Sequence, residues 1–240
     1  MDVEPNHFGP LYLIPTLLGE TEPLEVLPLS IKRTIEEVNH FIVENERSAR
    51  RFIKKITPRK SQDGLHLSLI NKYTEPEELP QYLEPCLQGI PVGLLSEAGC
   101  PAVADPGAKV VQIAHEKGIR VIPLVGPSSI LLALMASGMN GQSFAFTGYL
   151  PIDDTARRSA IRELEKRSKE TGQCQLFMET PYRNEKLFGE LVRSLRPGTR
   201  LCIAADLTLK SEYIRTLSVA EWKSIQPELH KRPAIFALQA

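Results

Sequence analysis

The sequence predicts an α/β protein with two α/β domains, each built around a mostly parallel sheet. Short runs of aliphatic and aromatic residues alternate with stretches whose apolar residues recur at helical spacing, which is typical of repeated strand–helix–strand units. After Leu150 a longer, more charged helical pattern opens a second series of elements, with Gly148–Asp154 as the connection. We therefore expect an N-terminal domain at residues 1–148 and a C-terminal domain at residues 149–240.

Strands and helices alternate through the expected N-terminal domain. The strand candidates are short and rich in β-branched, aliphatic or aromatic residues. They are Leu11–Pro15, His40–Val43, Val92–Leu95, Ile119–Leu124 and Phe144–Phe146. The helix candidates between them begin near Ser30, span Glu46–Ile56, span Pro76–Leu87, open at Pro106 and open at Pro127.

The expected C-terminal domain starts with a helix whose two ends are marked by sequence. Asp154 or Thr155 begins it, and Gly172 is the residue type that ends helices. The remaining elements follow in the order strand, helix, strand, short helix and strand. They are Gln175–Thr180, Pro181–Leu195, Thr199–Ala205, Ala220–Ser224 and Ala234–Ala240.

The composition excludes several function classes. Hydrophobic residues make up 42% of the 240 residues, and 29 Lys and Arg residues balance 29 Asp and Glu residues, so electrostatic attraction to a partner has to be local. Four cysteines without a C-x-x-C pair and five scattered histidines predict no metal site and a reducing cytoplasm. The acidic N-terminus does not predict a signal peptide, and the longest apolar run, Ile130–Ala136, is too short to span a membrane.

The segment Gly93–Gly107 (GLLSEAGCPAVADPG) starts as a buried strand and continues into small residues. In an α/β sheet, ligands bind beyond the carboxyl ends of the strands, and small residues let a ligand approach the main chain. Asp105-Pro106-Gly107 places a carboxylate and a proline where a helix starts. The alternative is an ordinary capped turn without a ligand.

A second segment, Val125–Met139, repeats this pattern. A strand ends at Leu124, a Gly-Pro-Ser-Ser turn follows, and a helix begins with Ser128 or Ser129 as its cap. Two such loops after strands of one sheet favour a shared pocket more than either does alone. Neither G-x-G-x-x-G after a strand nor a P-loop motif occurs, so an ordinary dinucleotide or nucleotide-triphosphate site lacks support.

These segments, with others in the same order, resemble the tetrapyrrole-methylase superfamily of S-adenosylmethionine-dependent methyltransferases. Within it, the sequence is most similar to the branch that methylates a cytidine ribose 2′-hydroxyl in small-subunit ribosomal RNA. The matching motifs extend from the first glycine-rich loop to the last strands. They are Ser96–Pro101 with Asp105–Gly107, Val125–Ser129, Ala136–Gly138, Phe146–Pro151, Glu179–Arg183 and Ala204–Lys210.

The resemblance implies a cofactor cleft between two α/β domains, S-adenosyl-L-methionine as the cofactor, ribosomal RNA or the small ribosomal subunit as partner, and a homodimer. A binding site made mostly of peptide groups needs Gly, Pro and Ser at its turns. By matching positions, the resemblance places the cofactor contacts at nine residues. They are Leu17, Gly99, Cys100, Val103, Ser128, Ser129, Met178, Ala205 and Pro233. Ordinary packing is the alternative for each, above all for Met178 and Val103, because such residues are usually buried.

A ribose hydroxyl is a poor nucleophile, so a base or a cation near its oxygen would help the transfer. Candidates are Glu46, Glu97, Asp105 and Arg183. Asp105 favours the helix-cap interpretation, whereas Glu97 lies inside the loop and is the better candidate for the base. Arg183 could hold a phosphate or a carboxylate. We therefore take Glu97 and Arg183 as the catalytic candidates.

One local charge run stands out from the neutral whole. Between Arg47 and Lys60 the chain carries seven Lys and Arg residues and no Asp or Glu. On a helix, part of this run forms a stripe that can follow phosphates, and we expect it to contact RNA. The stripe comprises Arg47, Arg50, Arg51, Lys54 and Lys55. A second basic cluster, Arg157–Arg167, is diluted by Glu163 and Glu165.

Two other functions remain open. The same fold could methylate a small tetrapyrrole, although the basic stripe and the closer motif match argue against it. A catalytically weak RNA-binding relative is also possible, because the loop Ile14–Glu20 and the segment Glu44–Arg47 match the family's motifs poorly.

Overall fold

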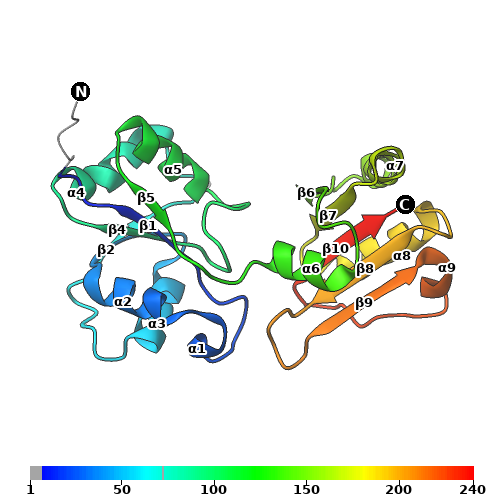
Figure 1. Ribbon diagram of the computed structural model, residues 1–240, viewed down its shortest axis with the longest axis horizontal. Coiled ribbons are helices and arrows are strands. Elements are labelled where there is room, and N and C mark those ends of the chain that lie inside the picture. The colour runs from blue at the N-terminus through cyan, green and yellow to red at the C-terminus, as the bar shows by residue number, and fades with distance from the viewer. Residues whose placement is uncertain (1–6, 72) are drawn as a thin grey trace. The chain divides into compact units, whose positions relative to one another are not determined.

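The computed structural model describes residues 7–71 and 73–240 and divides the chain into two compact units (Figure 1). Unit 1 ends at Pro127, and unit 2 runs from Ser128 to Ala240. The division between Pro127 and Ser128 comes earlier in the chain than the expected boundary between residues 148 and 149. The reason is that the helix α6 (Ser129–Ser137) and the strand β6 (Phe144–Tyr149), expected in the first domain, both pack within unit 2.

Unit 1 contains a five-stranded, fully parallel sheet, as the sequence predicts. Its order is β3-β2-β4-β1-β5. The strands are β1 (Leu11–Ile14), β2 (His40–Val43), β3 (His66–Leu69), β4 (Val92–Leu95) and β5 (Val121–Pro123). Strand β3 was not predicted. It is an edge strand whose residues are only half-buried or exposed, so it lacks the apolar run of the central strands.

Helices cover both faces of this sheet (Figure 1). On one face lie α1 (Pro23–Val26), α2 (Leu29–Glu37) and α3 (Glu46–Ile56), whose Ile31, Ile35 and Ile53 are completely buried. On the other lie the 3₁₀ helix η1 (Pro76–Leu83), α4 (Glu84–Leu87) and α5 (Gly107–Glu116). The expected helix Pro76–Leu87 is thus split, because the prolines inside it cannot donate the hydrogen bonds of a continuous α-helix.

Unit 2 contains a five-stranded sheet of order β6-β7-β10-β8-β9. Its further strands are β7 (Cys174–Met178), β8 (Arg200–Ala205), β9 (Tyr213–Ser218) and β10 (Ala234–Gln239). Only β6 and β7 are parallel, so the expectation of a mostly parallel sheet is wrong for this unit. The connection between β8 and β9 is short, so it suffices for a hairpin but not for a crossover. The other two antiparallel pairs arise because β10 lies between β7 and β8 and runs opposite to both. We did not predict β9, whose half-buried residues alternate weakly.

The helices of unit 2 follow the sequence signals closely. Helix α7 (Asp154–Thr171) has Asp153 as its N-cap and ends at Gly172, whose φ of 68° is left-handed. Helix α8 (Asn184–Ser194) and the short α9 (Val219–Trp222) pack with it against the sheet. The buried Trp222 donates its indole N–H to the carbonyl of Leu201 at 2.8 Å, which ties α9 to β8.

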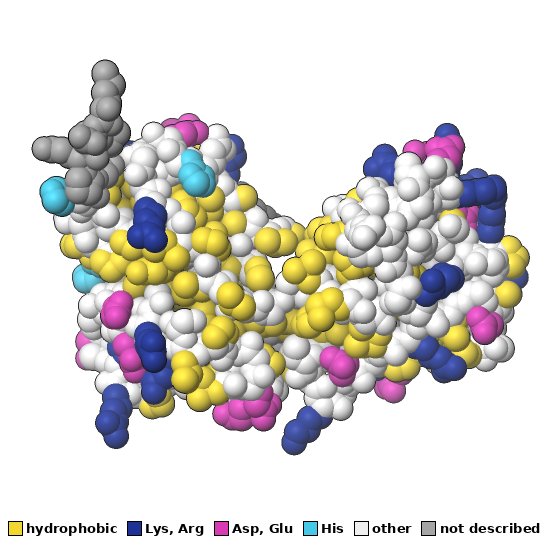
Figure 2. All heavy atoms as spheres, in the orientation of Figure 1, with side chains coloured by type: hydrophobic (Ala, Val, Ile, Leu, Met, Phe, Trp, Pro, Cys, Tyr) yellow, Lys and Arg dark blue, Asp and Glu magenta, His cyan; other side chains and the backbone are white. Residues whose placement is uncertain are grey.

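Side chains of both charges are interspersed on the face seen in Figure 2, as expected for a chain without net charge. No helix of the described residues is long and apolar enough to cross a membrane. The second basic cluster, Arg157–Arg167, presents fewer cations to solvent than the sequence suggests, because Arg157 is only 3% exposed. Its guanidinium bonds Glu190 at 2.5 and 2.8 Å and also reaches Asp154.

Glu190→Gln should destabilise the protein by about 3–5 kcal/mol, because it leaves a buried guanidinium without its main counter-charge. The pKa of Glu190 is lowered by its hydrogen bonds to Arg157, so this stability is present at neutral pH and declines on acidification through that pKa. Urea unfolding at pH 7 and pH 4 measures both effects. A matched Asp154→Asn variant, which alters the exposed end of the network, should lose much less; equal losses would contradict this assignment.

Candidate active site

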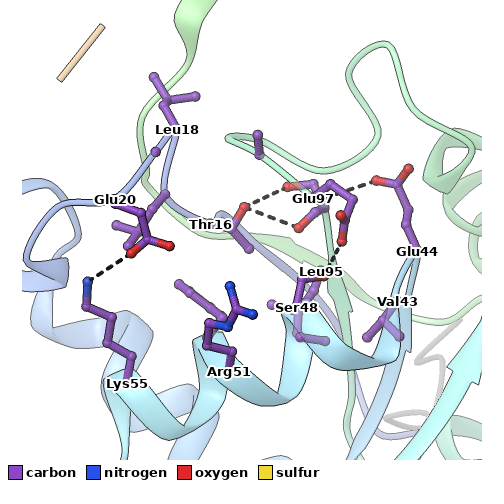
Figure 3. Close-up of a pocket in the computed structure, with 16 residues that line it drawn as sticks. Thr16, Leu18, Glu20, Val43, Glu44, Ser48, Arg51, Lys55, Leu95 and Glu97 are labelled. Atoms are coloured by element: carbon purple, nitrogen blue, oxygen red, sulfur yellow. Dashed lines mark hydrogen bonds and ion pairs between the residues drawn. The ribbon is translucent and has the colours of Figure 1, made fainter. Parts of the chain in front are cut away.

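A cavity of about 200 Å³ opens on unit 1 at the carboxyl ends of its central strands (Figure 3). The register of the sheet places Ile14 and Val43 on either side of Leu95, so the loops after β1, β2 and β4 emerge together. Val43, Leu95 and Phe52 of α3 form apolar parts of the lining. Polar groups from these loops and from α3 surround them. This is the position where α/β sheets bind ligands.

Two carboxylates and a serine meet at one end of the cavity (Figure 3). The hydroxyl of Ser48 on α3 donates to Glu97 Oε1 at 2.5 Å, and the backbone N–H of Glu97 donates to Glu44 Oε1 at 3.1 Å. Partial burial raises the pKa of Glu44, and the negative charges of Asp105 and Glu97 raise it further, whereas the hydrogen bond from the Glu97 amide lowers it. Glu97, the sequence candidate for the base, is therefore held in place from two sides.

Cations from α3 line the other end of the cavity. Figure 3 shows Arg51 and Lys55 rising from this helix. Lys55 Nζ donates to the carbonyl of Thr21 at 2.7 Å and lies 3.8 Å from Glu20. The exposed guanidinium of Arg51 has no hydrogen-bond or ion-pair partner among the described residues. The cavity thus combines apolar lining with acceptors at one end and an available cation at the other.

The first glycine-rich loop is shaped by Asp105. Its carboxylate accepts hydrogen bonds from the backbone N–H of Ala102 at 2.9 Å and of Gly107 at 2.8 Å, so it tethers the first residue of α5. Ala102 and Ala104 have φ values of 65° and 61°, a left-handed conformation that costs roughly 1–2 kcal/mol per non-glycine residue. This geometry supports the structural role expected for Asp105, although Pro106 occupies the N-cap position itself.

The two glycine-rich loops meet inside unit 1. Cys100 Sγ lies 3.4 Å from the carbonyl oxygen of Pro127, and the backbone N–H of Thr16 donates to the carbonyl of Gly99 at 2.9 Å. A Cβ on Gly126 would come within 2.2 Å of Pro15 Cβ, so this close approach requires glycine. The loops after β1, β4 and β5 are therefore one packed assembly up to Pro127.

This assembly fits a ligand held by peptide groups. The side chain of Val103 is 49% exposed, so it is not the core residue of the packing alternative. In the described part of the chain, the backbone N–H groups of Val103 and Ala104 have no hydrogen-bond partner, and the neighbouring side chains are small. Open amides next to small side chains can hold the polar edges of an adenosyl group and a carboxylate.

The cofactor candidates of unit 2 fall into two places. Ser128 caps α6 by accepting from the backbone N–H of Leu131 at 3.4 Å, and Ser129 is the first residue of that helix. Met178, Ala205 and Pro233 lie at one end of the inner strands of the second sheet, where β7 and β8 end and β10 begins. The side chain of Ala205 is completely buried, so only its peptide group is available to a ligand.

Arg183, the second catalytic candidate, lies in unit 2 at the N-cap position of α8. Its Nη2 donates to Glu179 Oε1 at 2.7 Å, and its Nε is buried without a hydrogen-bond partner among the described residues. Glu179 is itself buried, so the pair links the end of β7 to the start of α8. The Nη2 group of the guanidinium is thus already engaged in a structural ion pair.

Glu44 and Ser48 belong to the site but were not predicted as members of it. Glu44 is the first residue after β2, so its place beyond a strand's carboxyl end was a usable signal. Glu46, which we considered as a base, instead pairs with Arg50 at 2.8 Å on the surface of α3. No cluster of three or more potential metal ligands occurs in residues 7–71 and 73–240.

Residues 10–222 match the model of the family described as Tetrapyrrole (Corrin/Porphyrin) Methylases. The chain belongs to this family. It is therefore a methyltransferase.

Curated relatives add detail to this membership. Ribosomal RNA small subunit methyltransferase I of Vibrio cholerae is 28% identical to this methylase over 217 residues, which cover 90% of this chain and 71% of the relative. The Halalkalibacterium halodurans protein of the same name is 32% identical over 201 residues, which cover 83% of this chain and 65% of the relative. The chain thus spans only about two thirds of the length of these relatives.

Solved structures of other methyltransferases share the fold. The methyltransferase CobJ is 16% identical with a TM-score of 0.64, and the match covers 96% of this chain and 94% of CobJ. Uroporphyrin-III C-methyltransferase from Thermus thermophilus, solved in complex with S-adenosyl homocysteine, is 19% identical with a TM-score of 0.57, covering 96% of this chain and 97% of that one. At these identities the likeness extends to the fold alone.

Glu44→Gln should raise the free energy of unfolding at neutral pH. Because the pKa of Glu44 is raised in the folded protein, its ionised form is disfavoured there, so the wild type loses stability as pH rises above 4.5, the ordinary value. The advantage of the variant should disappear at lower pH, where Glu44 is protonated in both states. Urea unfolding across pH 4–8 measures the effect. Glu163→Gln, an exposed position on α7, is the control, and a pH-independent advantage of Glu44→Gln would contradict the assignment.

Proposed function

We propose that this methylase transfers a methyl group from S-adenosylmethionine to a ribose 2′-hydroxyl of small-subunit ribosomal RNA. The observation that carries the proposal is the cavity of unit 1, which combines an apolar lining and carboxylate acceptors with cations from α3. The names of the curated relatives support ribosomal RNA as the substrate. A tetrapyrrole substrate is less favoured, because none of the names of these relatives refers to one.

S-adenosylmethionine supplies a methyl group activated by a positively charged sulfur. We propose that the peptide groups of the packed loops hold this donor, with contacts from Leu17, Gly99, Cys100 and Val103 in unit 1. The family resemblance also assigns cofactor contacts to five positions of unit 2, which we keep as proposals. They are Ser128, Ser129, Met178, Ala205 and Pro233. Peptide groups tolerate changes of side chain, so such a site depends on the glycines and prolines of its loops more than on the other side chains.

Glu97 is the proposed proton acceptor. The new C–O bond forms as the S–CH3 bond breaks and the sulfur leaves as a neutral thioether, and the ribose hydroxyl must lose its proton in the process. A carboxylate already held by Ser48 would accept that proton without further ordering. Glu44, whose pKa is raised, fixes the backbone of Glu97 from the opposite side. Arg183 is proposed to contact a phosphate or carboxylate of the substrate through the part of its guanidinium that Glu179 leaves open.

The basic stripe on α3 is the proposed RNA contact, and its five members differ in their present partners. Arg50 bonds Glu46 and the carbonyl of Gln62, and Lys55 bonds the carbonyl of Thr21. Arg47, Arg51 and Lys54 are exposed and make no ion pair among the described residues. These three side chains are available to neutralise phosphates, whereas Arg50 and Lys55 would first have to exchange their partners. We further propose, from the family resemblance, that the protein acts in the cytoplasm as a homodimer.

Incubation with methyl-labelled S-adenosylmethionine and isolated small ribosomal subunits tests the function, with a tetrapyrrole precursor in a parallel reaction. Label should enter the RNA, and nuclease digestion should place it on a ribose. Label in the tetrapyrrole alone would contradict the proposal. Retention of RNA without label in either substrate would instead identify a catalytically weak RNA-binding protein.

Glu97→Gln should lower the rate of RNA methylation by about 10²–10⁴-fold, the usual contribution of a general base. The affinity for S-adenosylmethionine, measured by calorimetry, should stay close to that of the wild type, because the amide can still accept from Ser48. Glu163→Gln serves as the control. An unchanged rate in Glu97→Gln would exclude this carboxylate as the base.

Replacing Arg47, Arg51 and Lys54 by Gln should weaken RNA binding and flatten its salt dependence. Each phosphate that the variant no longer neutralises should reduce the slope of log affinity against log salt concentration by about 0.7–0.9. Filter binding across a salt series measures this slope. Arg158, Arg162 and Arg167, exposed on α7, provide the matched triple variant, and equal slopes for both triples would show that α3 has no special role.

A further inference from the structure

Three side chains from two loops of unit 2 form an exposed aromatic and basic surface, which we call the Tyr182 platform. Tyr182 follows β7, and His230 and Lys231 precede β10. The ring of Tyr182 is 72% exposed, and the His230 ring meets it edge-on at a centroid distance of 6.3 Å. Lys231 Nζ lies 6.0 Å from the Tyr182 ring centroid, within reach of a cation–π interaction.

The backbone beneath the platform is held by specific hydrogen bonds. The backbone N–H of Lys231 donates to the carbonyl of Pro181 at 3.1 Å, and the side-chain amide of the buried Asn184 donates to the carbonyl of Arg232 at 2.6 Å. Lys231 has a φ of 58°, a left-handed conformation that is costly for a lysine. These contacts join two loops distant in sequence and present an aromatic ring to solvent from a fixed support.

The cations around the platform differ in whether they are paired. Arg183 pairs with Glu179, and Arg232 pairs with Asp206 at 2.8 Å. Lys231 forms no ion pair within the described residues, so its ammonium group beside the exposed ring is available to an anion. A flat ring open to solvent and an adjacent unpaired cation together suit a ligand with a planar base and a phosphate.

We propose that the Tyr182 platform binds an unpaired nucleotide of single-stranded RNA, with a base stacked on the Tyr182 ring and a phosphate near Lys231. Stacking on an aromatic side chain combined with a nearby cation is the chemistry by which proteins hold single-stranded nucleic acids. The platform lies at the same end of the inner strands of the second sheet as Met178, Ala205 and Pro233. This inference rests on the proposed RNA substrate and adds a contact in unit 2, separate from the stripe on α3.

Fluorescence anisotropy with a labelled short single-stranded RNA of mixed sequence tests the platform. Tyr182→Ala should weaken binding by about 5- to 150-fold, the range typical for removal of one stacked base, whereas Tyr182→Phe should keep near wild-type affinity. Lys231→Gln should reduce the salt dependence of binding, in contrast to the exposed Lys223→Gln. Phe144→Ala, at an aromatic side chain 39% exposed where β6 begins, at the opposite end of the sheet, is the aromatic control. Calorimetry with S-adenosylmethionine checks that each variant is folded.

The outcomes separate the platform from the proposed function. Wild-type affinity in Tyr182→Ala, together with weakened binding when the α3 stripe is neutralised, would overturn the platform and leave the RNA methyltransferase proposal standing. Labelling of a tetrapyrrole alone would overturn the proposed function, while the RNA affinity of Tyr182→Ala would still decide the platform. A change in self-association by sedimentation, without a change in RNA affinity, would show that the surface contacts protein and would also overturn the platform.

Discussion

The site in unit 1 depends on the hydrogen bonds that the Asp105 carboxylate accepts from the main chain. They hold Ala102 and Ala104 near a loop geometry that alanine rarely adopts, and they begin α5. Partial burial raises the pKa of Asp105, and the amides of Gly107 and Ala102 oppose that effect. The strain of the loop is therefore balanced locally, by a residue that need not touch the substrate. Glycine at position 126, against Pro15, completes the packing from the neighbouring loop.

Much of unit 1 could be predicted from sequence because its signals are local. Asn45 caps α3, and its bounds Glu46–Ile56 agree with the prediction. The central strands are apolar runs buried on both faces, which makes them visible without any partner. The edge strand His66–Leu69 escaped prediction because its stability comes from pairing with β2, a contact that the sequence does not display. The same limit hid β9, which exists only as the partner of β8.

The direction of the strands in unit 2 could not be deduced from the alternation of elements. Helices between strands suggest crossovers, yet β10 returns between β7 and β8 and runs antiparallel to both. For the site in unit 1, the residue types in the sequence pointed to the loops that form it, but not to the side chains that contact one another there. Glu44 and Ser48 join Glu97 only because the strand register brings the ends of β2 and β4 together. Charge counting likewise could not show that Arg157 is a buried structural cation.

Ion pairing, rather than the number of cations, decides which basic residues remain available to a partner. A lysine or arginine that already bonds a carboxylate or a carbonyl gains little by exchanging it for a phosphate, because breaking the existing bond offsets the new one. By this criterion the cations available on the α3 stripe are Arg47, Arg51 and Lys54. Near Tyr182, Lys231 is available in full, and Arg183 only through the part of its guanidinium that Glu179 leaves open. A small number of available cations favours a modest affinity for RNA that depends strongly on where those cations lie. In a chain of zero net charge, recognition of RNA would then rely on stacking and shape as much as on charge.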